Sequence, residues 1–197
     1  MRRAAPGEEP AGTRAAVADP ARAGAWTLLA AGVLAQVAYP LLHGDGRATL
    51  TIAVVALMGA AAALGAIATL GAHAGLAVAG SAAVLGFAAD AAGANTGYPF
   101  GGYAYDGQLG PQAAAVPLIV ALAWVMGAVP AIAAARRLRP ATSPAALVGQ
   151  VAVAALGLWA WDLFLDPQMV ADGRWRWDHP RPGLPGVTDV PLTNAAG

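Results

Sequence analysis

Two acidic residues, Asp162 and Asp166, stand four apart near the end of a long apolar stretch, and Asp90 ends another such stretch. A spacing of four places both side chains on one helical face, which Trp159 shares. Burial, mutual repulsion and the negative end of the helix dipole all favour the neutral form of such a pair. We expect Pro167 to end the helix at Asp166. A carboxyl group held neutral near neutral pH can act as a general acid.

Each of these carboxyl groups also has a purely structural interpretation. Asp166 could form a turn with the proline that follows it, and Asp90 could lie in water at the end of its helix. Ionisable groups inside apolar helices are costly and usually functional. Asp162 lies deeper in its apolar stretch and next to Trp161, so a chemical role is favoured most strongly there.

Aromatic residues gather in the same two parts of the chain. Residues 98–105 hold Tyr98, Phe100, Tyr103 and Tyr105, and residues 159–177 hold Trp159, Trp161, Trp175 and Trp177. Such residues often form a belt at the membrane surface. They could instead line a pocket whose ring faces stabilise a cation. Composition alone does not choose between the belt and the pocket.

No residue pattern indicates a metal or a cofactor. The chain has no Cys, and His43, His73 and His179 are scattered without a ligand spacing. The glycine-rich stretch at 97–102 follows no predicted strand, so it does not read as a nucleotide-binding loop. We therefore expect chemistry without a cofactor, at a site without a metal.

The elements that must position these residues are membrane helices. The chain is 58% hydrophobic and only 11% charged, whereas soluble domains average about 25% charged residues. Three stretches carry no Asp, Glu, Lys or Arg: 48–89, 113–135 and 145–161. About 20 apolar residues suffice to cross a bilayer. The sequence thus predicts an all-α, polytopic membrane bundle, and the net charge of zero argues against nucleic acid as a partner.

We predict five spans, at about 25–42, 48–70, 76–89, 113–135 and 142–165. Residues 1–24 are predicted to be a disordered tail, 90–112 a polar outer loop and 166–197 a polar outer segment. Spans two and three should form a tight hairpin because only a short glycine-containing turn separates them. Four glycines are expected to let these two helices approach closely: Gly59, Gly65, Gly80 and Gly86.

The arginines predict the orientation. With five spans, the side of the N-terminus carries most of them, including Arg136, Arg137 and Arg139 after span four. The positive-inside rule then makes the N-terminal tail cytoplasmic in a plasma-membrane protein. Residues 90–112 and 162–194 must consequently both lie on the opposite face.

Two motifs resemble those of a known family. The first is DAAGANTGYPFGGYAY at 90–105, followed by LGP at 109–111 and VPL at 116–118. The second is WDLFLDPQM at 161–169, followed by GRWRW at 173–177 and PLTN at 191–194. Together they resemble the signatures of the carotenoid 1,2-hydratases, a family that includes bisanhydrobacterioruberin hydratase and other carotenoid biosynthesis proteins. Its members continue beyond the region of Asn194 into further membrane helix, so we expect this chain to be a shortened form.

The resemblance implies a cofactor-independent hydratase that adds water to the terminal 1,2 double bond of an acyclic carotenoid such as lycopene, dissolved in the bilayer. Asp162 or Asp166 would protonate the alkene, Asp90 would orient water, and Asn194 with the aromatic residues would contact the substrate. Other enzymes of the carotenoid pathway are expected partners. Two alternatives stay open: a small proton-coupled transporter, and a non-catalytic scaffold that holds carotenoid.

Overall fold

The computed structural model describes residues 19–183, 185–186 and 189–196. In this part of the chain, five helices are long and apolar enough to cross a membrane, which confirms the predicted all-α bundle. They are α1 (Pro20–Ala38), α2 (Gly44–Leu70), α3 (Ala72–Thr96), α4 (Ile119–Leu138) and α5 (Pro144–Ala171). A short 3-10 helix, η1 (Tyr39–Leu41), follows α1. A one-turn helix, α6 (Leu192–Ala196), is the last element in the chain order.

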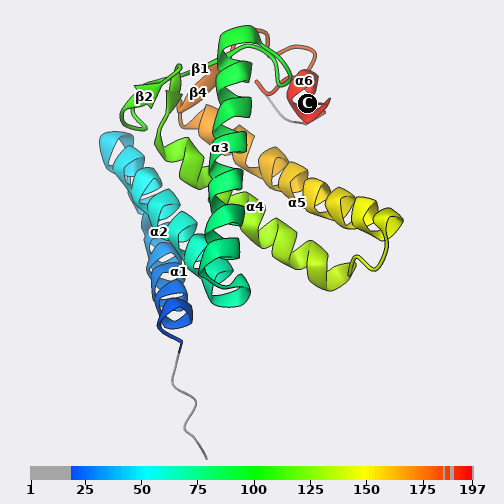
Figure 1. Cartoon of the computed structure of the whole chain (residues 1–197). Coiled ribbons are helices and arrows are strands. Elements are labelled where there is room, and N and C mark those ends of the chain that lie inside the picture. Colours follow the sequence, from blue (N-terminus) through cyan, green and yellow to red (C-terminus); the bar gives the residue numbers. More distant parts are fainter. Residues whose placement is uncertain (1–18, 184, 187–188, 197) are drawn as a thin grey trace, which may run out of the picture.

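The helices pack mainly against their sequence neighbours, with α4 also lying on α2. Small side chains let α2, α3 and α4 share a core of Ala66, Ala79, Val125 and Val129. Packing in lipid relies on such close contact, because the hydrophobic effect does not drive helices together there. Helix α5 packs on α4, and its N-terminal end diverges from α3 (Figure 1).

The predicted hairpin of the second and third spans is confirmed, and a single residue, Gly71, separates α2 from α3. Its φ of 83° is in the region that favours glycine. The close approach occurs at Gly75, where a Cβ would lie 2.5 Å from the Ile67 backbone. Gly65 and Gly80 have nothing within 4 Å of a Cβ, so their predicted role in this contact is wrong.

The other two predicted glycines face α4 instead of each other. A Cβ at Gly59 would lie 2.8 Å from the carbonyl oxygen of Leu122, and one at Gly86 would overlap the ring of Trp124. Both glycines therefore admit α4 to the hairpin. The expectation that they join spans two and three is wrong. Their small size does allow two helices to approach closely, as predicted, but the second helix is α4.

Helix boundaries depart from prediction at the start of α1 and at the end of α3. Helix α1 begins at Pro20, five residues early, because the Asp19 side chain accepts a hydrogen bond from the amide of Ala21 at 3.0 Å. The predicted tail before it lies outside the described residues. Helix α3 continues past Asp90 to Thr96 and ends at Gly97, whose φ of 74° is left-handed. Asp90 is therefore helical and does not begin a loop.

Around the fourth and fifth spans the predicted ends are also wrong. Helix α4 starts at Ile119, because β2 (Gln112–Ala113) and β3 (Val116–Pro117) first form a tight hairpin. Helix α5 runs through Pro167 to Ala171. Proline lacks an amide hydrogen, but the residues around it keep the helical path for one more turn.

Outside the spans, β1 (Tyr103–Tyr105) pairs antiparallel with β4 (Trp175–Trp177). Tyr103 stands opposite Trp177, and Tyr105 opposite Trp175. Segments about seventy residues apart thus lie side by side at one end of the bundle (Figure 1). This confirms that the two polar, aromatic segments lie at one end of the bundle, and it shows in addition that they pair.

Candidate active site

Asp90, on α3, accepts hydrogen bonds from three side chains. The Tyr103 hydroxyl donates a short hydrogen bond to Oδ1, and the Tyr105 hydroxyl donates to the same oxygen at 3.2 Å. The indole nitrogen of Trp124, on α4, donates to Oδ2 at 2.6 Å. All three donors are neutral. Hydrogen bonds to a carboxylate are stronger than those between neutral groups, so this arrangement suits an ionised Asp90.

Local structure explains why both phenols reach Asp90. Alternate residues of a strand point to the same side, so Tyr103 and Tyr105 both face α3 from β1. Gly93, one turn after Asp90, leaves room for them: a Cβ there would lie 3.0 Å from the rings of both Phe100 and Tyr103. Burial, and then the nearby charge of Asp90, raise the pKa of both phenols far above their usual range. The two tyrosines therefore act as donors and stay neutral.

Asp162 and Asp166 share one partner, the side-chain amide of Asn194 on α6. Its nitrogen donates to Oδ2 of Asp162 at 3.2 Å and makes a shorter bond to Oδ2 of Asp166. The amide group carries two hydrogens, so it can serve both carboxyl groups at once. Asp166 is 4% exposed and Asn194 7%. The predicted pair on one helical face is thus present and bridged, with Asp166 buried and Asp162 half-buried.

The three carboxyl groups form one cluster, which we call the carboxyl cluster: Asp90, Asp162 and Asp166. The Tyr103 ring that donates to Asp90 packs on Trp177, and both Trp177 and Thr193, the neighbour of Asn194, lie against Gly101. Helices α3 and α5 therefore bring their acidic residues together at the end of the bundle that carries β1, β4 and α6 (Figure 1).

The aromatic residues divide into two sets. Tyr103 and Trp177 pack with ring centroids 4.9 Å apart, and Tyr105 and Trp175 are 5.7 Å apart. These rings, with Phe100 beside Gly93, adjoin the carboxyl cluster. The remaining predicted residues are exposed: Tyr98 at 77%, Trp159 at 46% and Trp161 at 43%. The pocket interpretation fits the first set, and the membrane-belt interpretation fits the second.

A family model described as "Carotenoid biosynthesis protein" matches residues 46–197, which is most of the chain and includes both motifs. The chain belongs to the carotenoid biosynthesis protein family. Comparison with curated proteins and with solved structures finds no match. The matched region contains the whole carboxyl cluster of this carotenoid biosynthesis protein and every aromatic ring that adjoins it.

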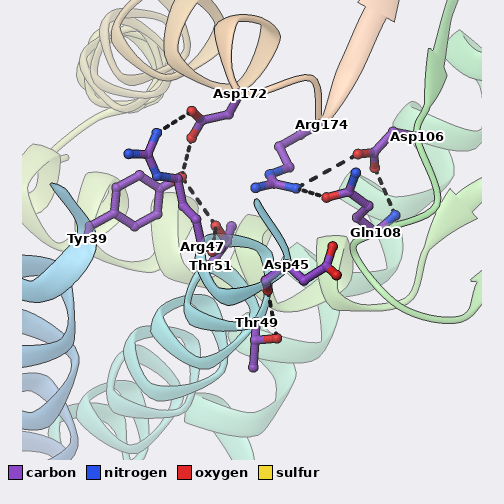
Figure 2. Close-up of polar contacts among 9 residues, drawn as sticks. All are labelled: Tyr39, Asp45, Arg47, Thr49, Thr51, Asp106, Gln108, Asp172 and Arg174. Atoms are coloured by element: carbon purple, nitrogen blue, oxygen red, sulfur yellow. Dashed lines mark hydrogen bonds and ion pairs between the residues drawn. The ribbon is translucent and has the colours of Figure 1, made fainter. Parts of the chain in front are cut away.

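In this carotenoid biosynthesis protein, a second polar group fixes the end of α5 (Figure 2). The Asp172 carboxylate accepts hydrogen bonds from the Tyr39 hydroxyl at 2.7 Å and from Nη1 of Arg47 at 2.6 Å. We call these three residues the Asp172 clamp. Burial alone would raise the pKa of Asp172, but the hydrogen bonds from Tyr39 and Arg47 and the Arg47 charge outweigh it, so the pKa is lowered. The clamp ties α5 to the ends of α1 and α2.

Arg174, two residues later, is 2% exposed and joins the same end of α5 to the outer loop. Its Nη1 donates a short hydrogen bond to the Gln108 side chain and lies 3.8 Å from Oδ2 of Asp106 (Figure 2). Its carbonyl oxygen accepts from the Asp106 amide at 3.0 Å. These contacts hold β1 and β4 in register next to the carboxyl cluster.

Sequence reasoning missed Trp124 and the Asp172 clamp. Trp124 is the only aromatic residue within residues 113–135, so it could have been noticed as an indole N–H donor in an otherwise aliphatic span. The clamp joins residues more than 120 positions apart, and no local pattern signals it. Among the described residues, no three His, Cys, Asp or Glu side chains are arranged to hold a metal ion.

Proposed function

We propose that this protein hydrates the terminal 1,2 double bond of an acyclic carotenoid and so forms a tertiary alcohol. The observation that carries this proposal is the carboxyl cluster, of which Asp166 is buried and the other two are half-buried, beside aromatic rings at one end of an apolar bundle. Adding water to a trisubstituted alkene needs a proton donor, shielding for a cation and an acceptor for the proton of water. The carboxyl cluster supplies the proton donor and the proton acceptor, and the adjoining aromatic rings supply the shielding of the cation.

The proposed step balances without any redox partner. One carboxyl group of the Asp162 and Asp166 pair gives its proton to C2, and the alkene electrons form the new C–H bond. The tertiary cation is left on C1. The oxygen of water bonds to C1 and its proton passes to the Asp90 carboxylate. Transfer of that proton back to the pair restores the starting state, and the net change is the gain of one water.

The roles follow from the hydrogen bonds. Asp90 accepts three neutral donors and is thereby suited to be the carboxylate that orients water. Asp162 and Asp166 share a single amide, and two adjacent carboxylates repel each other unless one holds a proton. The face of the Tyr103 or Trp177 ring can stabilise a nearby cation.

Expression in a lycopene-producing host, with pigments analysed by mass spectrometry, tests the proposal. The wild type is expected to yield product heavier than lycopene by one water. Asp162→Asn and Asp166→Asn, made separately, are expected to lower the yield by about a hundredfold or more if the residue changed is the acid. Asp45→Asn is the control, because Asp45 is an exposed residue of the first turn of α2. No product from the wild type contradicts the function, and full activity in both variants contradicts the mechanism.

We further propose that the bundle lies in the plasma membrane with its N-terminus in the cytoplasm. The last turn of α4 carries Arg136 and Arg137, and this end of the helix lies away from the carboxyl cluster (Figure 1). The positive-inside rule then directs the cluster to the outer face. Other carotenoid-pathway enzymes are proposed partners, since they would supply and consume a substrate confined to the bilayer.

A further inference from the structure

An apolar groove of about 520 Å³ runs along the bundle between α3, α4 and α5. Its lining residues belong to α3 and α4, with Leu158 from the middle of α5. The lining residues that matter here are Ser81, Ala82, Leu85, Gly86, Trp124 and Leu158. Its volume falls within the range of about 300–1,000 Å³ that is usual for small-molecule sites.

The groove leads to the carboxyl cluster through Trp124. A side chain at Gly86 would overlap the Trp124 ring, so glycine there lets the indole lie directly against the backbone of α3. The ring lines the groove, and its N–H donates to Asp90 at 2.6 Å. Ala89, next to Asp90 in sequence, lines the groove as well. One end of the groove is therefore in contact with a residue of the carboxyl cluster.

The shape and chemistry of the groove suit a long hydrocarbon. On α3 its lining extends from Ala77 to Ala89, a length of about 18 Å at about 1.5 Å per residue. Apart from Ser81 and the Trp124 indole, the lining side chains are aliphatic or absent. The groove is too small to hold a transmembrane helix of a partner protein. Such a helix, of the same length and about 10 Å across with its side chains, would occupy roughly 1,400 Å³. That is more than twice the volume of the groove.

We propose that the isoprenoid chain of the substrate lies in this groove, with its reacting end at Trp124 and the carboxyl cluster. This inference rests on the proposed function and adds the route by which the substrate approaches. The chain enters sideways from the bilayer, where α3 and α5 diverge, and needs no hydrogen-bond partner along its length. The Trp124 indole then lies beside the part of the chain next to the reacting end and holds Asp90 through its N–H.

Filling the groove tests the proposal. Ser81 is exposed and lines the groove, so Ser81→Phe adds a ring there without displacing buried side chains. We expect it to lower lycopene hydration by about tenfold to a hundredfold. Gly80→Phe is the matched control, since Gly80 is on the same helix, does not line the groove and has open space around its Cβ position. Wild-type hydration by Ser81→Phe would overturn the proposal.

A second measurement is independent of turnover. The chain has no Cys, so Ser81→Cys and Gly80→Cys each supply a unique site for a nitroxide spin label in lipid nanodiscs. Lycopene is expected to lower the collision rate of oxygen with the label at 81 and to leave the label at 80 unchanged. Shielding at 81 without hydration would refute the proposed function and retain the groove. Hydration without shielding of the label at 81 from oxygen would mean that lipid occupies the groove. Spin–spin broadening would mean that a second copy of this protein occupies it. Either result overturns the assignment of the groove to the substrate.

Discussion

Replacing Trp124 by Phe removes one hydrogen bond to Asp90 and leaves an aromatic ring beside the groove. The lost bond joins an indole N–H to a carboxylate oxygen over 2.6 Å, at a part-buried site. Hydrogen bonds to charged groups contribute about 1.5–3 kcal/mol. At about 1.36 kcal/mol for each factor of ten, the hydration rate should fall roughly 10- to 150-fold if Asp90 must be held in place to orient water.

The assay is the initial rate of lycopene hydration in isolated membranes, for Trp124→Phe, Asp90→Asn and the double variant. If Trp124 acts through Asp90, the double variant should be no slower than Asp90→Asn alone, because the two changes remove the same contribution. Full activity of Trp124→Phe beside an inactive Asp90→Asn would refute the argument, and so would independent, multiplying losses. Thermal unfolding in detergent separates loss of activity from loss of fold.

Three further outcomes are expected. Gly86→Ala should lower the free energy of unfolding by about 1–3 kcal/mol, because its methyl group overlaps an indole ring, whereas Gly80→Ala should be neutral or stabilising; thermal denaturation compares them. Asp172→Asn should cost about 1–3 kcal/mol near neutral pH. Because the pKa of Asp172 is lowered, this difference should begin to shrink as pH falls below about 4, the usual Asp value, and vanish once pH falls below the lowered pKa. The pKa values of Tyr103 and Tyr105 are raised, so stability should fall as pH rises above about 10, and less so in the variant with both changed to Phe.

The membrane bundle could be predicted from the sequence because the bilayer imposes a simple rule. A stretch without charge and long enough to span must be helical, since its backbone polar groups have no other partners in lipid. That rule located all five helices. It could not locate their ends: Asp90 was expected to begin a loop, but its three donors satisfy it within α3. Likewise, Pro167 was expected to end α5, which continues to the Asp172 clamp.

The sequence identified many of the residues of the candidate site, but it did not show which of them contact one another. The spacing of Asp162 and Asp166 correctly placed both on one helical face, and the number of spans correctly placed the two polar segments at one end of the bundle; the pairing of β1 with β4 was not predicted. The aromatic residues could not be sorted, because Tyr103 and Trp161 differ only in what the tertiary fold places beside them. Trp124 was missed for the same reason, since its hydrogen bond depends on the absence of a side chain at Gly86.

The bridge from Asn194 to the two acids of α5 also sets an order of assembly during synthesis. The last donor to Asp90, Trp124, is made before α5 begins, whereas Asn194 follows Asp166 by 28 residues. At about 5–20 residues per second, α5 is complete for a few seconds before its amide partner is made. Membrane insertion must therefore tolerate two unbridged carboxyl groups in a helix where each is costly. The donors to Asp90 are thus all made before α5, and the amide that bridges Asp162 and Asp166 is made last.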